Sequence, residues 1–419
     1  MKRVGKLACI VLFSTLAVNV ATLAQESDQI TPAFLANAHP MHTKTLPPRA
    51  SDGLGFTLRQ NSGLPGIDSV VNFLGQFNAA GVDSNGNPQS TWYYSMVGNP
   101  PQRGDTTIIH APVIPVSLDL LNADGSLRYH YDVKPYVRPT LESPVFVPSK
   151  FTSSKFPTQF TDAIQRAEFF HVMDEDWHTL LIPHLKKRRT MAIPKGEYYF
   201  ALNPDGSCCA FVLVDANTFS NLLFPPTYPV DNTTIIGAAE LAGDITTKDV
   251  STFLFPNTYL YFNGDPNQCC VLGFHSFDYE PGDASNGNLP RAYIMNYSSW
   301  ISPGLFGASF EDITALSHEM AETFNDPFVV FDGVHNATPW WLSPNGNCQN
   351  NMEVGDVIEG LPNAVYPIQK FGFTYHPQNE ALLQWFEFQS PSTALDGAYS
   401  YPNTQTLTAL SPPENVNCQ

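Results

Sequence analysis

The residues best suited to chemistry in this chain lie in the segment S-F-E-D-I-T-A-L-S-H-E-M-A-E-T-F-N-D-P, residues 309–327. His318 and Glu322 are one helical turn apart, so in a helix their side chains share a face, with Glu319 beside them. Zinc hydrolases bind their metal through two side chains at this spacing, and the Glu after the first ligand handles the water. A carboxylate oxygen is also a zinc ligand. We therefore predict a Zn²⁺ site on His318 and Glu322, with Glu319 as general base.

The same segment predicts one helix. Ser309 and Asp312 form a capping-box pattern at its start, and Pro327 disfavours helical geometry at Asp326. No Lys or Arg occurs in residues 304–331, so the carboxylates lack the basic partners of a salt-bridged surface helix. A solvated polar face is the alternative, but clustered carboxylates repel one another unless a cation lies among them. Opposite the polar row, apolar residues repeat at helical spacing: Ile313, Leu316, Met320 and Phe324.

A catalytic zinc normally takes three protein ligands and a water. Downstream, M-E-V-G-D supplies Glu353 and Asp356 on a loop that can fold back over the helix, and Asp326 is the next residue on the same helical face. The third ligand is therefore Glu353, Asp356 or Asp326, and Asp326 can instead orient a ligand. For Glu353 and Asp356 the alternative is a turn with solvated acids. His335 and His376 are further candidates as ligands or hydrogen-bond donors.

The start of the chain predicts export. M-K-R-V-G-K, an apolar run and T-L-A before Gln25 have the form of a secretory signal peptide that is cleaved after Ala24. The apolar run is too short for a membrane span, and no later segment approaches the required length. The formal net charge of −18 repels nucleic acid and anionic membrane surfaces. We expect a secreted or periplasmic protein that binds no nucleic acid and has no membrane span.

Apart from Cys9 in the leader, the chain has six cysteines, and an even number in an exported protein favours disulfides. Two adjacent pairs each follow a polar turn and open an apolar strand. We therefore expect these two strands to be neighbours joined by one or two bridges. The six cysteines are Cys208, Cys209, Cys269, Cys270, Cys348 and Cys418.

Periodicity predicts an α+β order of elements. We expect helices over residues 67–80 and 158–170, a hairpin around N-A-D-G-S, and a last strand over residues 382–388. The other expected strands cover residues 198–201, 209–214, 259–262, 270–277 and 291–297. The expected fold is a mixed sheet packed on the H-E-x-x-E helix, with irregular loops rich in Pro and Gly. The expected divisions are a signal peptide (1–24), an N-terminal arm (25–66), an N-terminal α/β region (67–190), a metal-binding catalytic region (191–390) and a C-terminal tail (391–419).

The motifs also resemble a known pattern. S-H-E-M-A-E-T-F-N-D-P, E-V-G-D and L-L-Q-W are similar to the H-E-L-A-E…D-P…W…E-I-x-D-x-C…Q-W pattern of exported bacterial metallopeptidases of the H-E-x-x-E type. The plant EXORDIUM-like, phosphate-induced protein family has a similar pattern, and V-L-G-F-H-S resembles its G-Y-H-S strand. The resemblance covers about residues 269–388 and implies a zincin-like core. His318, Glu319 and Glu322 occupy the first motif, and Glu353 and Asp356 the second. Ile358 replaces the Cys of the plant pattern, so the disulfides of that family do not transfer.

We therefore expect a secreted zinc-dependent hydrolase of the peptidase type that acts on an extracellular peptide or protein. The alternative is a non-catalytic extracellular or cell-wall recognition protein whose metal site is structural or vestigial and whose partner is a glycan or wall component. Glu322 in place of His and the many Tyr, Phe and Trp residues favour this alternative. The sequence leaves the substrate, the cysteine pairing and the oligomeric state open.

Overall fold

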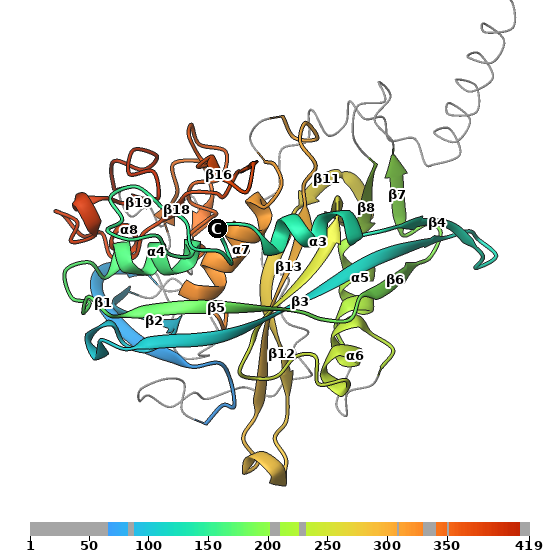
Figure 1. Ribbon diagram of the computed structural model, residues 1–419, viewed down its shortest axis with the longest axis horizontal. Coiled ribbons are helices and arrows are strands. Elements are labelled where there is room, and N and C mark those ends of the chain that lie inside the picture. Colours follow the sequence, from blue (N-terminus) through green and yellow to red (C-terminus); the bar gives the residue numbers. More distant parts are fainter. Residues whose placement is uncertain are drawn as a thin grey trace, which may run out of the picture.

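The computed structural model describes residues 66–82, 88–201, 210–225, 232–307, 310–329, 341–349 and 352–410 (Figure 1). The predicted signal peptide, the arm up to residue 65 and His335 lie outside these residues, as do Cys208, Cys209 and Cys418. No helix within the described ranges is long and apolar enough to cross a membrane.

A mixed seven-stranded sheet forms the centre of the structure (Figure 1). Its main path is β12 (Gly273–Glu280), β13 (Arg291–Trp300), β9 (Val250–Pro256), β3 (Thr106–Leu121) and β4 (Leu127–Tyr131). β3 also pairs with β5 (His178–Leu185) and β6 (Arg189–Ile193). β12 and β4 are antiparallel to their neighbours, and the other pairs are parallel. The sheet therefore combines strands from both predicted regions, 67–190 and 191–390.

The two faces of this sheet bury separate hydrophobic cores, because alternate side chains of a strand point to opposite sides. On one face, Leu254 and Ile294 belong to the core that includes α4 (Phe160–Glu168), α7 (Thr314–Asn325) and α8 (Leu383–Phe386). On the other, Phe255 and Tyr297 belong to the core that includes α5 (Ala216–Leu223), α6 (Ile235–Leu241) and a smaller sheet. The fold is therefore mixed α+β, as the sequence predicts.

The smaller sheet corrects the prediction for the cysteines. Its four strands lie in the order β11 (Asp265–Val271), β10 (Thr258–Phe262), β8 (Phe211–Asp215) and β7 (Tyr198–Ala201). Cys269 and Cys270 lie at the end of β11, and β10 lies between β11 and β8; β12, which follows this pair, belongs to the larger sheet. The strands next to the two cysteine pairs are therefore not neighbours. Cys269 forms its disulfide with Cys270 and not with another strand. The reason is that the short turn at Gly264 folds β11 back onto β10, which itself pairs with β8.

Shorter elements complete the described fold. α3 (Lys134–Leu141) contacts β3, and 3₁₀ turns occur at Pro101–Arg103, Ala284–Asn286 and Leu395–Gly397. The two-stranded pairs are β1 (Asn72–Val82) with β2 (Pro88–Val97), β14 (Trp341–Leu342) with β15 (Cys348–Gln349), β16 (Ile368–Lys370) with β17 (Phe373–Tyr375), and β18 (Glu380–Ala381) with β19 (Ser400–Tyr401).

The helix predicted for residues 67–80 is wrong, because most of this segment is strand β1. Phe73 and Phe77 are buried on one side of the strand, and Gly75 occupies the position between them. The ring of Tyr94 lies over Gly75, where a Cβ atom would lie 2.0 Å from Tyr94 Cζ. The buried face of β1 therefore has a glycine where the two-residue period of a strand would place an apolar side chain. The remaining apolar residues happen to have the spacing of a helix.

The strand predicted for residues 382–388 is also wrong. The segment contains the helical turn α8, all four of whose residues are buried. An apolar run that is buried on every side has neither a two-residue nor a 3.6-residue period, so its pattern cannot separate strand from helix. The helix predicted over residues 158–170 is confirmed as α4, and the hairpin before it is confirmed as β3 and β4.

Glu168 connects α4 to the two helices beside it. The residue is 2% exposed, and its Oε1 accepts hydrogen bonds from Asn325 Nδ2 on α7 and from the backbone N–H of Leu383 on α8, both at 3.1 Å. Gln384 Nε2 donates a hydrogen bond to the backbone carbonyl of Glu168 at 2.7 Å. Burial raises the pKa of the Glu168 carboxyl to about 8. The folded protein therefore keeps this group protonated at neutral pH.

We predict that Glu168→Gln makes the protein more stable than the wild type above pH 8 and slightly less stable near pH 5. Because the folded-state pKa is raised, the stability linked to Glu168 is present in full below about pH 4.5 and is lost as the pH rises to about 8, with a total on the order of 5 kcal/mol. Gln keeps the accepting oxygen but cannot ionise. At pH 5 its amide lacks an acceptor, which costs about 1 kcal/mol.

Melting temperatures measured from pH 5 to pH 9 test this crossing of the two stability curves. Glu175→Gln is the matched control, because Glu175 is exposed and paired with Lys155 at the surface. Its curve should stay parallel to that of the wild type. A Glu168→Gln curve that also stays parallel would contradict the assignment of a neutral buried carboxyl.

Candidate metal centre

Helix α7 carries the H-E-x-x-E residues into the interior of the protein. All twelve of its residues are buried, so the solvated-face interpretation of the polar row is wrong. The helix ends before Asp326, as Pro327 predicts, but it begins at Thr314. The capping box is not formed at Asp312, which accepts hydrogen bonds from the backbone N–H groups of Ile313 and His376. Ser309 lies outside the described residues.

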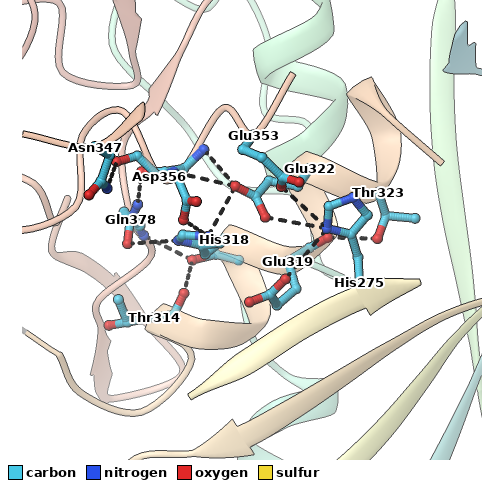
Figure 2. Close-up of polar contacts among 12 residues, drawn as sticks. His275, Thr314, His318, Glu319, Glu322, Thr323, Asn347, Glu353, Asp356 and Gln378 are labelled. Atoms are coloured by element: carbon cyan, nitrogen blue, oxygen red, sulfur yellow. Dashed lines mark hydrogen bonds and ion pairs between the residues drawn. The ribbon is translucent and has the colours of Figure 1, made fainter. Parts of the chain in front are cut away.

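His318 faces two carboxylates (Figure 2). Its Nε2 lies 3.1 Å from Glu322 Oε1 and 3.4 Å from Asp356 Oδ1. Its Nδ1 lies 3.2 Å from Gln378 Oε1, and Gln378 Nε2 donates to the carbonyl of Gly355 at 2.8 Å. The amide group of Gln378 is thus oriented with its oxygen toward the imidazole. Donation from Nδ1–H to this oxygen leaves the Nε2 lone pair directed at the two carboxylates, which is the tautomer of a metal ligand.

The loop that carries Asp356 is tied to α7 by the same carboxylate. Glu322 Oε1 accepts from the backbone N–H groups of Gly355 at 3.1 Å and Asp356 at 3.3 Å. Asn347 Nδ2 donates to the Asp356 carbonyl at 3.0 Å from the other side. A Cβ at Gly355 would lie 2.6 Å from His318 Nδ1. Glycine is therefore required for the loop to approach the imidazole this closely.

A second histidine, His275 on β12, lies on the other side of Glu322 (Figure 2). Its Nδ1 lies 3.4 Å from Glu322 Oε2 and 3.7 Å from both Glu319 Oε2 and Glu353 Oε2. The residue is 1% exposed, and neither ring nitrogen forms a hydrogen bond. Gly273, two residues earlier, allows this approach, because a Cβ there would lie 2.6 Å from Glu319 Cγ. The strand and the helix therefore meet at a glycine.

The structure divides the predicted ligands between the two histidines. His318, Glu322 and Asp356 each offer a ligand atom within 4.8 Å of the others. Glu353 and Asp326 form another group of this kind with His275, and Glu322 also belongs to a group with His275 and Glu319. His275 was not predicted as a site residue. The signal for it is a histidine within the apolar run V-L-G-F-H-S, in the strand that the family resemblance also includes.

His376 belongs to neither group. Its Nδ1 lies 2.7 Å from Asp312 Oδ2 and 3.5 Å from Glu311 Oε2, and its carbonyl accepts from Thr314 Oγ1 at 2.7 Å. The side chain of Asp312 raises the pKa of the His376 imidazole. His376 therefore fastens the chain before Gln378 to the start of α7.

Electrostatics in the centre are dominated by buried carboxylates. Burial lowers the pKa of His275 and His318, but the surrounding carboxylates outweigh this effect and hold both well above the usual value. Burial raises the pKa of Glu319 and Glu353. Burial by itself would also raise the pKa of Glu322, but the two histidines outweigh this effect and lower that pKa. Glu322 is therefore the carboxylate most strongly held in its ionised form.

A small pocket touches the centre beside His318 and Glu319. Its volume of about 10 Å³ is close to the space that one water molecule needs. A larger pocket of about 520 Å³ lies elsewhere, beside the basic residues Lys134, Lys186 and Arg188. No residue of the metal centre lines this larger pocket. The small pocket is lined by Leu272, Gly273, Phe310, Thr314, Ala315, His318, Glu319, Glu359 and Gln378.

The spacing of the donor atoms fits a tetrahedral ion. Bonds of about 2.0–2.2 Å to N and O ligands place neighbouring donors about 3.3–3.6 Å apart around a tetrahedral zinc. The distances from His318 Nε2 to Glu322 and Asp356, 3.1 and 3.4 Å, are close to this edge. One imidazole and two carboxylates leave a fourth position for water.

No family model matches this chain, and no curated protein and no solved structure matches it either.

We predict that Gly355→Ala both destabilises the protein, by about 1–3 kcal/mol, and reduces its uptake of zinc, because the added methyl forces the loop or the imidazole to move. Melting temperature and bound zinc are the two measurements. Gly304→Ala is the control, since Gly304 has a φ of +88° and nothing within 4 Å of an added Cβ. It should lose stability through backbone strain and keep its zinc. Normal zinc uptake by Gly355→Ala would show that the loop does not shape the site.

Proposed function

We propose that the protein is an exported zinc-dependent hydrolase, most suited to peptide substrates, that uses a metal-activated water and Glu319 as general base. The observation that carries the proposal is the convergence of His318, Glu322 and Asp356 in a buried site, with Glu319 and a pocket for about one water beside them. The predicted signal peptide supports export, and the family resemblance supports a zincin-like fold.

His318, Glu322 and Asp356 would hold the ion. Zinc in such a site lowers the pKa of a bound water and polarises a carbonyl group. Glu319 lines the pocket, and burial raises the pKa of its carboxyl, which suits a group that must accept a proton near neutral pH and then release it. Glu319 would take the proton from the attacking water and pass it to the leaving amine. Gln378 would keep His318 in the tautomer that presents Nε2.

The position of β12 favours a peptide as the substrate. β12 is the last strand on its side of the seven-stranded sheet, and Gly273 at its start lines the pocket next to Leu272. An extended peptide can add to the edge of a sheet through backbone hydrogen bonds. A peptide placed there would carry its own carbonyl groups past Glu319.

The ligand set also predicts slow chemistry. Two carboxylates neutralise the charge of a zinc ion, whereas the two histidines of H-E-x-x-H leave that charge in place. The ion bound here should therefore be a weaker Lewis acid.

A non-catalytic recognition protein with a structural metal is the second candidate. The observation that favours it is the closed site, because His318 is 5% exposed and the pocket admits about one water molecule. Its partner would be a glycan or a wall component. Stabilisation by metal without hydrolysis of any member of a peptide library would favour this candidate.

We predict that Glu319→Gln lowers kcat/KM on a cleaved peptide by roughly 10²–10⁴-fold and leaves bound zinc unchanged, because the amide cannot accept the proton. Glu175→Gln, on the surface, is the control for the loss of a carboxylate and should retain full activity. Full activity in Glu319→Gln would exclude this residue as the base.

We predict that His318→Ala loses zinc, whereas His171→Ala, which removes an exposed histidine, keeps it. The measurement is elemental analysis of purified mature protein after dialysis against zinc. Equal zinc in both variants would place the metal elsewhere. No zinc in the wild type, even after its addition, would remove the basis of the proposed function.

A further inference from the structure

We propose that the centre binds two divalent cations bridged by Glu322, the second of them held by His275, Glu353 and Asp326. This inference rests on the proposed metal site at His318, and it adds a second ion behind that site on the side of β12. The first observation is the position of Glu322, whose carboxylate lies between the two histidines in Figure 2. Oε1 is 3.1 Å from His318 Nε2, and Oε2 is 3.4 Å from His275 Nδ1. Each oxygen thus serves a different histidine, which is how a carboxylate bridges two metals.

The distances around His275 are those of ligands that share an ion. Its Nδ1 lies 3.4–3.7 Å from oxygens of Glu322, Glu319 and Glu353. A direct hydrogen bond between nitrogen and oxygen spans about 2.7–3.2 Å, so all three contacts are too long. Donors around a tetrahedral zinc lie about 3.3–3.6 Å apart. At His318, the distance to Asp356 is 3.4 Å and that to Glu322 is shorter, 3.1 Å, so the longer separations are a feature of His275 above all.

His275 has carboxylates nearby but no hydrogen bond of ordinary geometry. The residue is 1% exposed, and neither of its ring nitrogens forms a hydrogen bond. A buried polar group without a hydrogen bond is unfavourable. A cation among His275, Glu353 and Asp326, whose ligand atoms all lie within 4.8 Å of one another, would satisfy one of these nitrogens.

The charge of the centre favours two cations over one. At least six carboxylates, each less than 10% exposed, lie around the two histidines. If these six are ionised and the histidines are neutral, one divalent cation leaves a net charge of −4 and two leave −2. Buried like charges at this distance are strongly unfavourable, because the interior screens them poorly. The six are Glu319, Glu322, Asp326, Glu353, Asp356 and Glu380.

The donor chemistry indicates the kind of ion. One imidazole and several carboxylates suit Zn²⁺, and also Mn²⁺ or Co²⁺, better than Ca²⁺, which prefers oxygen ligands alone. Two ions about 3.5–4 Å apart can hold the attacking and the leaving oxygen of a reaction together. A second ion would also offset the weak Lewis acidity of the first.

The competing account has one ion at His318, while His275 is a charged positioning residue that holds Glu322 in place by electrostatic attraction. The number of bound ions separates the two accounts. Metal-free mature protein is titrated with Zn²⁺, and bound zinc is counted after removal of the excess. We expect two ions per chain in the wild type and one in Glu353→Gln, which keeps the shape of the side chain. His275→Ala should also retain one.

The outcomes are distinct. One ion in the wild type, unchanged in Glu353→Gln and His275→Ala, overturns the second site and leaves the proposed function intact. No ion in the wild type overturns both. Titration with Mn²⁺ provides a second measurement, because two bridged ions give an exchange-coupled electron paramagnetic resonance spectrum. Uncoupled signals from two bound Mn²⁺ ions would overturn the bridge.

The described residues contain two further groups of possible ligands: Glu311, Asp312 and His376 at the start of α7, and Glu240, Asp278 and Glu280 on the α6 side of β12. One further variant tests the second of these groups as the location of the second ion. Asp278→Asn should therefore still bind two ions. Loss of one ion in Asp278→Asn, together with two ions in Glu353→Gln, would assign the second ion to that group and overturn the proposal. Melting temperatures of all the variants in chelator confirm that each one is folded.

Discussion

The rest of this structure depends on the burial of a row of carboxylates. Glu319 and Glu322 on α7 are 1% and 0% exposed, and Glu353 and Asp356 close over them. The interior of a protein screens charge poorly, so each ionised group here needs an opposite charge at short range. The imidazoles of His275 and His318 form ion pairs with these four residues. The arrangement of the sheet, the helix and the loop follows from this need to bring donors together.

Two glycines make the close packing possible. Gly273 lets the first residues of β12 lie against Glu319, and Gly355 lets the downstream loop lie against His318. Both positions need glycine because a side chain packs against the backbone there, and not because of a positive φ, since neither glycine has a left-handed backbone. The loop is then fastened to Glu322 through two backbone N–H groups. The same residue thus orients a loop and faces two histidines, which is why a change at Glu322 would affect both fold and site.

The sequence was sufficient for the elements whose pattern is local. The end of α7 shortly before Pro327, the hairpin of β3 and β4 and helix α4 follow from periodicity and turn residues. β1 was misread because Gly75 makes room for Tyr94, a contact between strands that no local period contains. The missing capping box has a similar cause, since Asp312 accepts hydrogen bonds from His376, 64 residues away. In both cases a tertiary contact replaced the local rule.

The candidate site could be predicted as far as α7 and its loop, because H-E-x-x-E and E-V-G-D have spacings that carry chemical meaning. The sequence could not show that Glu353 lies near His275 and Asp356 near His318, because this depends on how the loop crosses the helix. His275 could not be derived from spacing either, because it lies 43 residues before His318 in the sequence and reaches the centre only through the pairing of β12 with β13.

Burial also couples the metal to the fold. Without a cation, the buried carboxylates must either take up protons or repel one another. The raised pKa values of Glu319 and Glu353 mean that these two groups take up protons more readily than exposed carboxylates do. With a cation, they can all ionise, so the free energy of metal binding becomes part of the free energy of folding. A bound cation would therefore complete the packing of α7, β12 and the loop at Gly355 in the same step in which it is bound.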